Sequence, residues 1–295
     1  MNNCLKGVEF SIWTADAIRR ASVVSVTEKR TTDKGIALKD GLRDPRMGPM
    51  RGKCKTCNLT KGRCPGHFGY IELEEHILHV SWITNIIHWL KSTCIHCGDI
   101  LIKDIDPNKL TGPRNKIMNQ YVKKLHSKCQ QCGKKQPKYA WNKEKQQILK
   151  SGAPYDTNDI LKHLSMVPDE VVSTMKVSHP KHMLLKALPV PPPQVRPPIM
   201  MGDVIRGEDD LTYRLLQILR LNEKLKKIKS NNRPSHIIAN AREALQIAVT
   251  GYINHKKLGN SRKRASKREY TSLTAKLGSK AVSYTHLTLP TTPYV

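Results

Sequence analysis

The spacing of the cysteines constrains this chain more than any other feature. Seven of the eight cysteines and one histidine fall into two groups of four. The first group follows the pattern C-x2-C-x6-C-x2-H: Cys54, Cys57, Cys64 and His67. The second consists of two C-x2-C pairs: Cys94, Cys97, Cys129 and Cys132. Because two thiolates separated by two residues can bind one zinc ion from a single turn of backbone, the sequence predicts two Zn²⁺ sites.

Both predicted zinc sites are structural. Four protein ligands complete a tetrahedral shell and leave no position for a catalytic water. A zinc hydrolase or deaminase is the enzyme alternative, but the chain has no His-x-Glu or His-Glu-x-x-His pattern to supply a general base. His67 is predicted to be a ligand because it closes the run that starts at Cys64, whereas His96 and His126 are predicted to be bystanders and Cys4 a free thiol.

The compartment bears on the cysteine chemistry. The first twenty residues lack the basic-then-apolar order of a signal peptide, which favours a reducing compartment. In a reducing compartment, cysteines bind metal more often than they form disulfides, which are the alternative. No stretch approaches the roughly 18 consecutive apolar residues that a membrane span needs, so no membrane association is expected.

The charge of the chain predicts a polyanionic partner. The 51 Lys and Arg residues exceed the 24 Asp and Glu residues by 27, and such an excess favours nucleic-acid phosphates. A basic arm at about residues 255–270 concentrates the charge: Lys256, Lys257, Arg262, Lys263, Arg264, Lys267 and Arg268. A solvated surface is the alternative for such a run, but its turn-like context favours an arm that contacts phosphates without reading sequence.

Periodicity predicts several elements between these features. Residues 8–12 alternate like a strand, and residues 80–90 have helical spacing. The latter helix leads directly to Cys94, so the two metal groups are expected to be close neighbours. Further helices are predicted at 113–126 and 156–166, and as an antiparallel pair from 211 and from 236 to 252, with Ser235 as the N-cap. The proline-rich residues 188–198 are expected to be extended polyproline.

Five segments resemble one family, the largest subunit of multisubunit DNA-directed RNA polymerases, and are most like eukaryotic RNA polymerase II or its relatives in large DNA viruses. The segments are residues 41–48 (GLRDPRMG), 64–73 (CPGHFGYIEL), 94–98 (CIHCG), 188–198 (LPVPPPQVRPP) and 206–212 (RGEDDLT). They occur in order, and the resemblance covers roughly residues 5–280. A free-standing zinc-binding transcription regulator, the alternative, does not account for the proline run joined to residues 206–212.

The resemblance implies a fold and a role. The fold is α+β, helix-rich and irregular: a clamp core and clamp head held by zinc at residues 1–187, and the start of the polymerase core at 188–280. The clamp closes over DNA and the RNA–DNA hybrid. Residues 195–213 resemble the lid and residues 255–270 the rudder. Implied partners are the second-largest subunit, other polymerase subunits, template DNA and the hybrid.

The resemblance also locates the chemistry elsewhere. The family's catalytic Mg²⁺ is held by an aspartate loop that this sequence lacks, so the chain alone is expected to be an inactive fragment of a nucleotidyltransferase. Asp209 and Asp210 are predicted to be charges at a helix N-terminus instead. Residues 281–295 resemble a translated cloning adapter. The expected location is the nucleus if the protein is cellular, and the virion or a cytoplasmic viral factory if it is viral.

Overall fold

The computed structural model describes residues 11–33, 35–50, 52–101, 128–174, 178–201, 204–258 and 271–278. Several predicted features lie outside these residues: the strand residues Val8 and Phe10, the helix at 113–126, Cys4, His126, residues 281–295, and the cations Arg262, Lys263, Arg264, Lys267 and Arg268. Ile12, at the end of the predicted strand, lies outside any strand. In the described part of the chain, no helix is long and apolar enough to cross a membrane.

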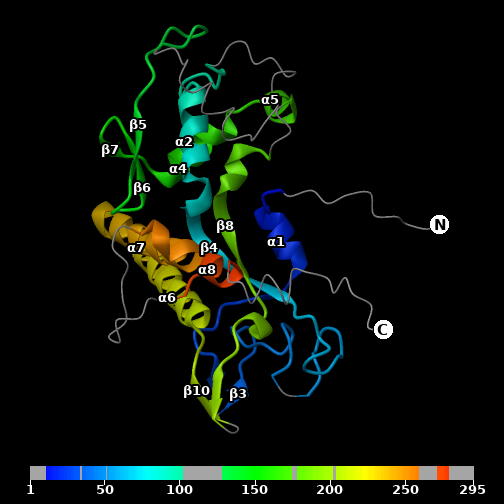
Figure 1. Ribbon diagram of the computed structural model, residues 1–295. Helices are drawn as coiled ribbons and strands as arrows, with labels where there is room; N and C mark the ends of the chain where they lie inside the picture. Colours follow the sequence, from blue (N-terminus) through cyan, green and yellow to red (C-terminus); the bar gives the residue numbers. More distant parts are fainter. Residues whose placement is uncertain are drawn as a thin grey trace, which may run out of the picture.

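A three-stranded sheet runs through the middle of the molecule (Figure 1). Its central strand, β4 (Phe68–Leu78), pairs parallel with β1 (Ser22–Ser25) and antiparallel with β8 (Leu184–Val190). Ile71, Leu73 and Ile77 alternate along β4 and are buried, as a strand with one face in a core requires. Helix α1 (Ala15–Ala21) precedes β1 and packs against the same sheet.

A second core lies beyond the end of β4. The 3₁₀ turn η1 (Val80–Trp82) and helix α2 (Ile83–Ser92) confirm the helix predicted at 80–90. The small sheet of β5 (Tyr139–Asn142), β6 (Gln147–Lys150) and β7 (Ala153–Pro154) was not predicted. Helix α4 (Thr157–Ser165) is confirmed, with Asp156 as its N-cap. Helix α5 (Asp169–Thr174) and the turn η3 (Pro180–Met183) lead into β8.

The antiparallel helix pair is confirmed as α6 (Asp210–Ser230) and α7 (Ser235–Asn254), which lie side by side. The apolar spacing predicts that each helix buries one side, and these positions are buried except for Ile238, which is partly buried: Leu211, Leu215, Ile218, Leu219 and Leu225 in α6, and Ile238, Ala241, Leu245, Ala248 and Val249 in α7. Ser235 as the N-cap is wrong: α7 begins at Ser235 itself. Pro234 has an extended backbone, and its carbonyl accepts from the backbone N–H of Ile237 at 3.0 Å, so it occupies the cap position.

The proline run is only partly extended, which corrects the polyproline prediction. Its first three residues end β8, where Pro189 is tolerated because β8 is an edge strand. Pro193–Val195 then form a 3₁₀ turn, η4. The lid-like segment continues as an antiparallel hairpin of β9 (Ile199–Met201) and β10 (Val204–Gly207), and α6 follows. A second short hairpin joins β2 (Thr32–Asp33) and β3 (Ile36–Ala37).

The prediction that the two metal groups are close neighbours is wrong. The chain between them forms β4 before it enters α2, and a strand of eleven residues spans about 35 Å. Figure 1 shows the segment that precedes β4 near one end of the molecule and the end of α2 near the other. The error arose because residues 68–78 were not recognised as a strand.

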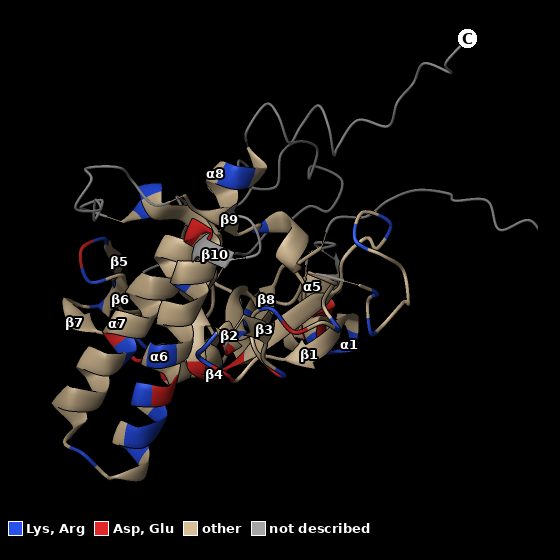
Figure 2. Ribbon diagram, turned by 90° about the horizontal axis from the view of Figure 1, so that it is seen from below, with Lys and Arg blue, Asp and Glu red and all other residues tan. Residues whose placement is uncertain are grey.

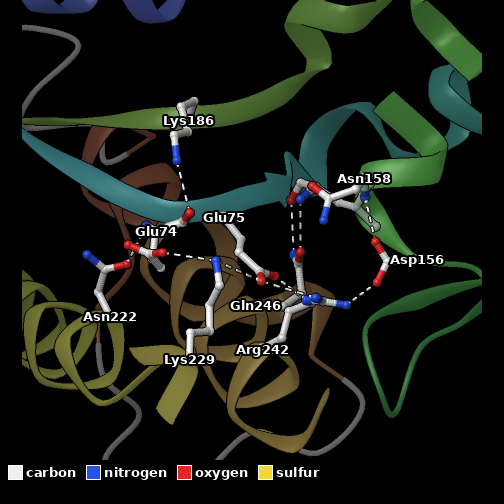
Figure 3. Close-up of polar contacts among 10 residues, drawn as sticks. Glu74, Glu75, Asp156, Asn158, Lys186, Asn222, Lys229, Arg242 and Gln246 are labelled. Atoms are coloured by element: carbon white, nitrogen blue, oxygen red, sulfur yellow. Dashed lines mark hydrogen bonds and ion pairs between the residues drawn. The ribbon is translucent and has the colours of Figure 1, made fainter. Parts of the chain in front are cut away.

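Two amide side chains attach the helix pair to β4 (Figure 3). β1 pairs only with residues 68–70 of β4, so the edge beyond them has no strand partner among the described residues. Asn222 of α6 accepts from the Glu74 N–H and donates to the Glu72 carbonyl, both at 2.8 Å. Gln246 of α7 bonds the N–H and the carbonyl of Leu78, both at 2.9 Å. Each amide thus replaces a neighbouring strand, which fixes the helices against the sheet.

An ionic cluster completes this junction. Glu75 points to the same side of β4 as the buried apolar residues and is itself 6% exposed. Arg242 of α7 forms a bidentate ion pair with Glu75 and also contacts Asp156, the N-cap of α4. Lys229 of α6 lies 3.5 Å from Glu75 and 2.9 Å from Glu74. The cluster therefore joins β4, α4 and both long helices.

Candidate metal centres

Three turns with the same backbone geometry carry six of the eight predicted ligands. In each turn the first cysteine's carbonyl accepts from the N–H four residues later, at 2.9–3.0 Å, and its N–H donates to the carbonyl five residues later. An isolated β-bridge closes each turn. The residue after the second cysteine has a positive φ, at Asn58, Gly98 and Gly133, a conformation that glycine and asparagine adopt most easily. The C-x2-C spacing thus presents both sulfurs on one side of the turn.

The first metal group collects ligands from the turn at Cys54 and from the segment that leads into β4. The Sγ atoms of Cys57 and Cys64 are 3.6 Å apart, and Cys64 Sγ is 3.7 Å from Nε2 of His67. All four ligand atoms lie within 4.8 Å of one another. A tetrahedral zinc site with Zn–S bonds of about 2.3 Å has S–S edges of about 3.8 Å. The arrangement therefore fits one zinc ion, with His67 as the fourth ligand.

The second metal group joins two turns that are distant in sequence. Cys94 Sγ lies 3.6 Å from that of Cys132, and Cys97 Sγ 3.6 Å from that of Cys129. The four sulfurs again lie within 4.8 Å of one another. Each sulfur of one turn therefore lies close to a sulfur of the other turn, and this set also fits a single tetrahedral ion. His96 is not among the ligand atoms, as expected.

Gln136 is a contributor that the sequence analysis did not single out. Its Nε2 donates to Cys94 Sγ at 3.2 Å, and its Oε1 accepts from the Ile95 N–H at 3.2 Å. A hydrogen bond to a sulfur orients the ligand and stabilises its negative charge. No local motif marks this glutamine, because its partner lies 42 residues earlier.

Backbone N–H groups lower the pKa of the first cysteine in each group. Burial alone would raise the pKa of Cys54 and Cys94, but hydrogen bonds from the N–H groups of the second and third residues after each, together with those from neighbouring cysteines, outweigh it. The pKa of Cys94 falls to about 6. By contrast, burial raises the pKa of Cys64 to about 11. The lowered pKa of Cys94 favours the thiolate, the form that binds metal.

Two glycines offer a matched test of the second group. Gly98 and Gly133 occupy equivalent positions with φ of 75° and 69°. A Cβ at Gly98 would lie 2.9 Å from the Met166 carbonyl oxygen, whereas one at Gly133 meets nothing within 4 Å. We expect Gly133→Ala to cost about 1 kcal/mol for the left-handed backbone and Gly98→Ala to cost more in urea unfolding. Equal losses would contradict the contact with Met166.

The structure describes only two of the seven cations predicted to contact nucleic acid. Lys256 and Lys257 lie exposed in the turn η5 (His255–Lys257), and the other five cations of the arm lie outside the described residues. His255 Nδ1 and Ser272 Oγ are 3.0 Å apart, so the first residue of the arm is joined to the chain just after it. As predicted, Asp209 is the N-cap of α6 and Asp210 lies in its first turn.

A second cationic surface was not singled out in the sequence. Figure 2 shows Lys and Arg gathered on the half of α6 near its C-terminus. The sequence there carries five cations: Arg220, Lys224, Lys226, Lys227 and Lys229. Four cations, with Glu223, Ile228 and Asn231, line a hollow of about 300 Å³: Arg220, Lys224, Lys227 and Arg233. The cations are visible in the sequence as a charge run in a helical segment. The sequence analysis interpreted that segment only through its apolar spacing, as a packed helix.

The family of the chain is established by comparison. Residues 2–281 match the family model described as RNA polymerase Rpb1, domain 1. The chain belongs to this family. It is similar to the DNA-directed RNA polymerase subunit Rpo1N of Sulfolobus acidocaldarius, with 34% identity over 277 residues, and to that of Thermococcus celer, with 32% over 282. Each alignment covers 85% of this chain and 31% of the relative. The chain therefore spans about a third of the length of these relatives.

The fold agrees with the family assignment. The α+β fold class is confirmed, and both predicted four-residue groups of this polymerase domain are assembled. The relatives named here are archaeal. The division of the chain at residue 187 stays a prediction; β8 extends across that position, and one core contains Leu185 and Leu188.

Proposed function

We propose that this chain forms the clamp of a DNA-directed RNA polymerase, as the N-terminal region of its largest subunit. The observation that carries the proposal is the family match over residues 2–281. The net charge of +27 suits a surface that holds DNA and the RNA–DNA hybrid. The nucleotidyltransferase activity and its Mg²⁺ belong to the longer subunit in this proposal, and this chain contributes grip on nucleic acid.

Two Zn²⁺ ions are part of the proposal. Cys54, Cys57, Cys64 and His67 hold one, and Cys94, Cys97, Cys129 and Cys132 hold the other. Both sets offer four protein ligands with the spacing of a closed tetrahedral shell. Zinc bound in this way supplies folding energy to segments with little apolar core. The role of the metals is to hold turns in place.

The proposed partners follow from the family. They are the second-largest subunit, other polymerase subunits, template DNA and the RNA–DNA hybrid. The β9–β10 hairpin is proposed to act as the lid and residues 255–270 as the rudder. The narrower likeness to eukaryotic RNA polymerase II or a viral relative stays a proposal. So does the location, which is the nucleus, or a virion or viral factory, according to the source.

Hybrid binding tests the proposed contact of the basic arm. Alanines at Arg262, Lys263 and Arg264 are expected to weaken binding of an RNA–DNA hybrid, because they remove cations that bind phosphates. Each lost phosphate contact should also reduce the magnitude of the slope of log K against log salt by about 1. Fluorescence anisotropy of a labelled hybrid between 50 and 200 mM salt, roughly the range over which such contacts show, measures the slope.

A matched triple variant controls for the loss of charge. Lys128, Lys134 and Lys135 are exposed around the turn at Cys129, far in sequence from the arm, and alanines there remove the same three charges. We expect the control to keep the slope of the unmodified chain. An arm variant with an unchanged slope would remove the rudder from the proposal. Failure to co-purify with the second-largest subunit would favour a free-standing zinc-binding regulator.

A further inference from the structure

Two buried arginines meet at the base of the β9–β10 hairpin. Arg196 lies three residues before β9 and is 1% exposed. Its Nε donates to the Pro191 carbonyl at 3.0 Å, its Nη1 to the hydroxyl of Thr212 at 3.3 Å, and its Nη2 to the carbonyl of Leu42. Thr212 is completely buried in the first turn of α6, just after the hairpin. One guanidinium therefore joins the chain before the hairpin, the chain after it, and the loop at residues 41–50.

Arg43 makes the second connection from the same loop. It is also 1% exposed, and it pairs with both carboxylate oxygens of Glu208, with Nε at 3.1 Å from Oε1. Glu208 follows the last residue of β10. A buried cation is costly unless its donors are bonded. The pKa of Arg196 is lowered by burial to about 10, so its guanidinium stays charged at neutral pH and needs its partners.

The loop at 41–50 in turn rests on the first metal group. The His67 N–H donates to the Met47 carbonyl at 2.9 Å, and the Thr56 hydroxyl to the Arg46 carbonyl at 2.7 Å. The same group also touches the proline run directly: a Cβ at Gly66 would lie 2.7 Å from the ring of Pro192. Metal ligands, loop, arginines and hairpin thus form one continuous set of contacts.

The hairpin depends on such support. In the part of the chain that the structure describes, β9 and β10 form a two-stranded sheet with no third strand, and an isolated pair of strands is at best marginally stable in water. Ile199 at its start is 66% exposed, so little apolar burial holds it there. The described side-chain contacts that can orient the hairpin lie at its two ends, where the arginines bind.

We propose that Arg43 and Arg196 are positioning residues that fix the hairpin, and that the first metal group acts on the hairpin through them. The position of the hairpin follows from contacts of this chain alone. Its consequence for separating RNA from template rests on the proposed lid function.

Hydrogen exchange of the full chain tests the positioning. Glu208→Gln removes the charge that Arg43 needs, and Thr212→Val removes one acceptor of Arg196 with little change in shape. Both are expected to speed exchange of the β9–β10 amides about tenfold while α6 and α7 keep their protection. Glu144→Gln, in the exposed β5–β6 turn, is the matched control. Unchanged exchange in both variants, or equal loss across the helices, would overturn the proposal.

A cysteine pair tests the part played by the metal. Cys57→Ser in the first group should speed exchange in the hairpin, whereas Cys97→Ser in the second group should not. Equal effects of the two variants would overturn the link from metal to hairpin. In the assembled polymerase, Glu208→Gln is expected to lengthen the RNA–DNA hybrid. A normal hybrid together with fast hairpin exchange would leave the positioning intact and remove the lid function.

Discussion

Serine at Cys94 is expected to lower the zinc content from two ions to one and to unfold the surroundings of the second metal group. Structural zinc contributes about 10–16 kcal/mol in small zinc-binding peptides, and removal of a thiolate forfeits much of it. Among the described residues, the local apolar cluster contains only Leu101 besides three of the cysteines, so the metal is expected to supply most of the stability there. Zinc content by mass spectrometry and exchange of residues 93–101 and 128–136 measure the two effects.

Cys4→Ser is the control for the change from cysteine to serine, because both groups have four ligands without Cys4. This variant should keep two zinc ions. Cys64→Ser should also reduce zinc to one ion but leave exchange around Cys94 unchanged, since β4 and α2 separate the two groups. A Cys94→Ser chain that still holds two ions would refute the four-cysteine site.

The metal ligands could be predicted because the knuckle turn is local. Two cysteines and the residue after them determine its backbone, and the positive φ at Gly98 and Gly133 suits the glycines there. Which turns combine is not local. The fold brings together the turn at Cys94 and the turn that holds Cys132. The prediction that they share one ion rested on the number of ligands, because the eight ligands divide into two sets of four.

The sequence analysis did not predict β4, because one of the buried positions of this strand holds a charged residue. Ile71, Leu73 and Ile77 alternate as in a strand with one buried face, but Glu75 occupies the position between the last two. A carboxylate there hides the period of two. The structure resolves the conflict with Arg242, which neutralises Glu75 from a helix 167 residues later.

The polar partners that organise the fold share this limit. Arg43 and Glu208 are separated by 165 residues, and Gln246 and Leu78 by 168. Local spacing carries no information about such pairs, and each residue considered alone reads as an ordinary surface side chain. The helices α4, α6 and α7 were predictable in contrast, because apolar spacing repeats within a few residues.

Alanine at Arg242 is the second change with a large expected effect. Glu75 is 6% exposed, and it would keep only Lys229 at 3.5 Å. Removal of one partner of a buried ion pair typically costs about 3–5 kcal/mol, because a charge is left without compensation. Asp156 loses a partner too. Urea unfolding of the zinc-loaded chain should therefore show a loss near this range, monitored through α6 and α7, which the cluster attaches to β4.

The size of the loss in unfolding free energy distinguishes two explanations: an unpaired buried charge at Glu75, or the loss of an ordinary surface contact. Arg233→Ala, in the exposed turn after α6, is the matched control and should change stability by less than about 0.5 kcal/mol. The double variant Glu75→Gln with Arg242→Met should recover much of the loss, because it removes the buried carboxylate together with its bidentate partner. If the double variant is as unstable as Arg242→Ala alone, the ion pair itself, rather than relief of an unpaired Glu75, holds the helix pair on β4.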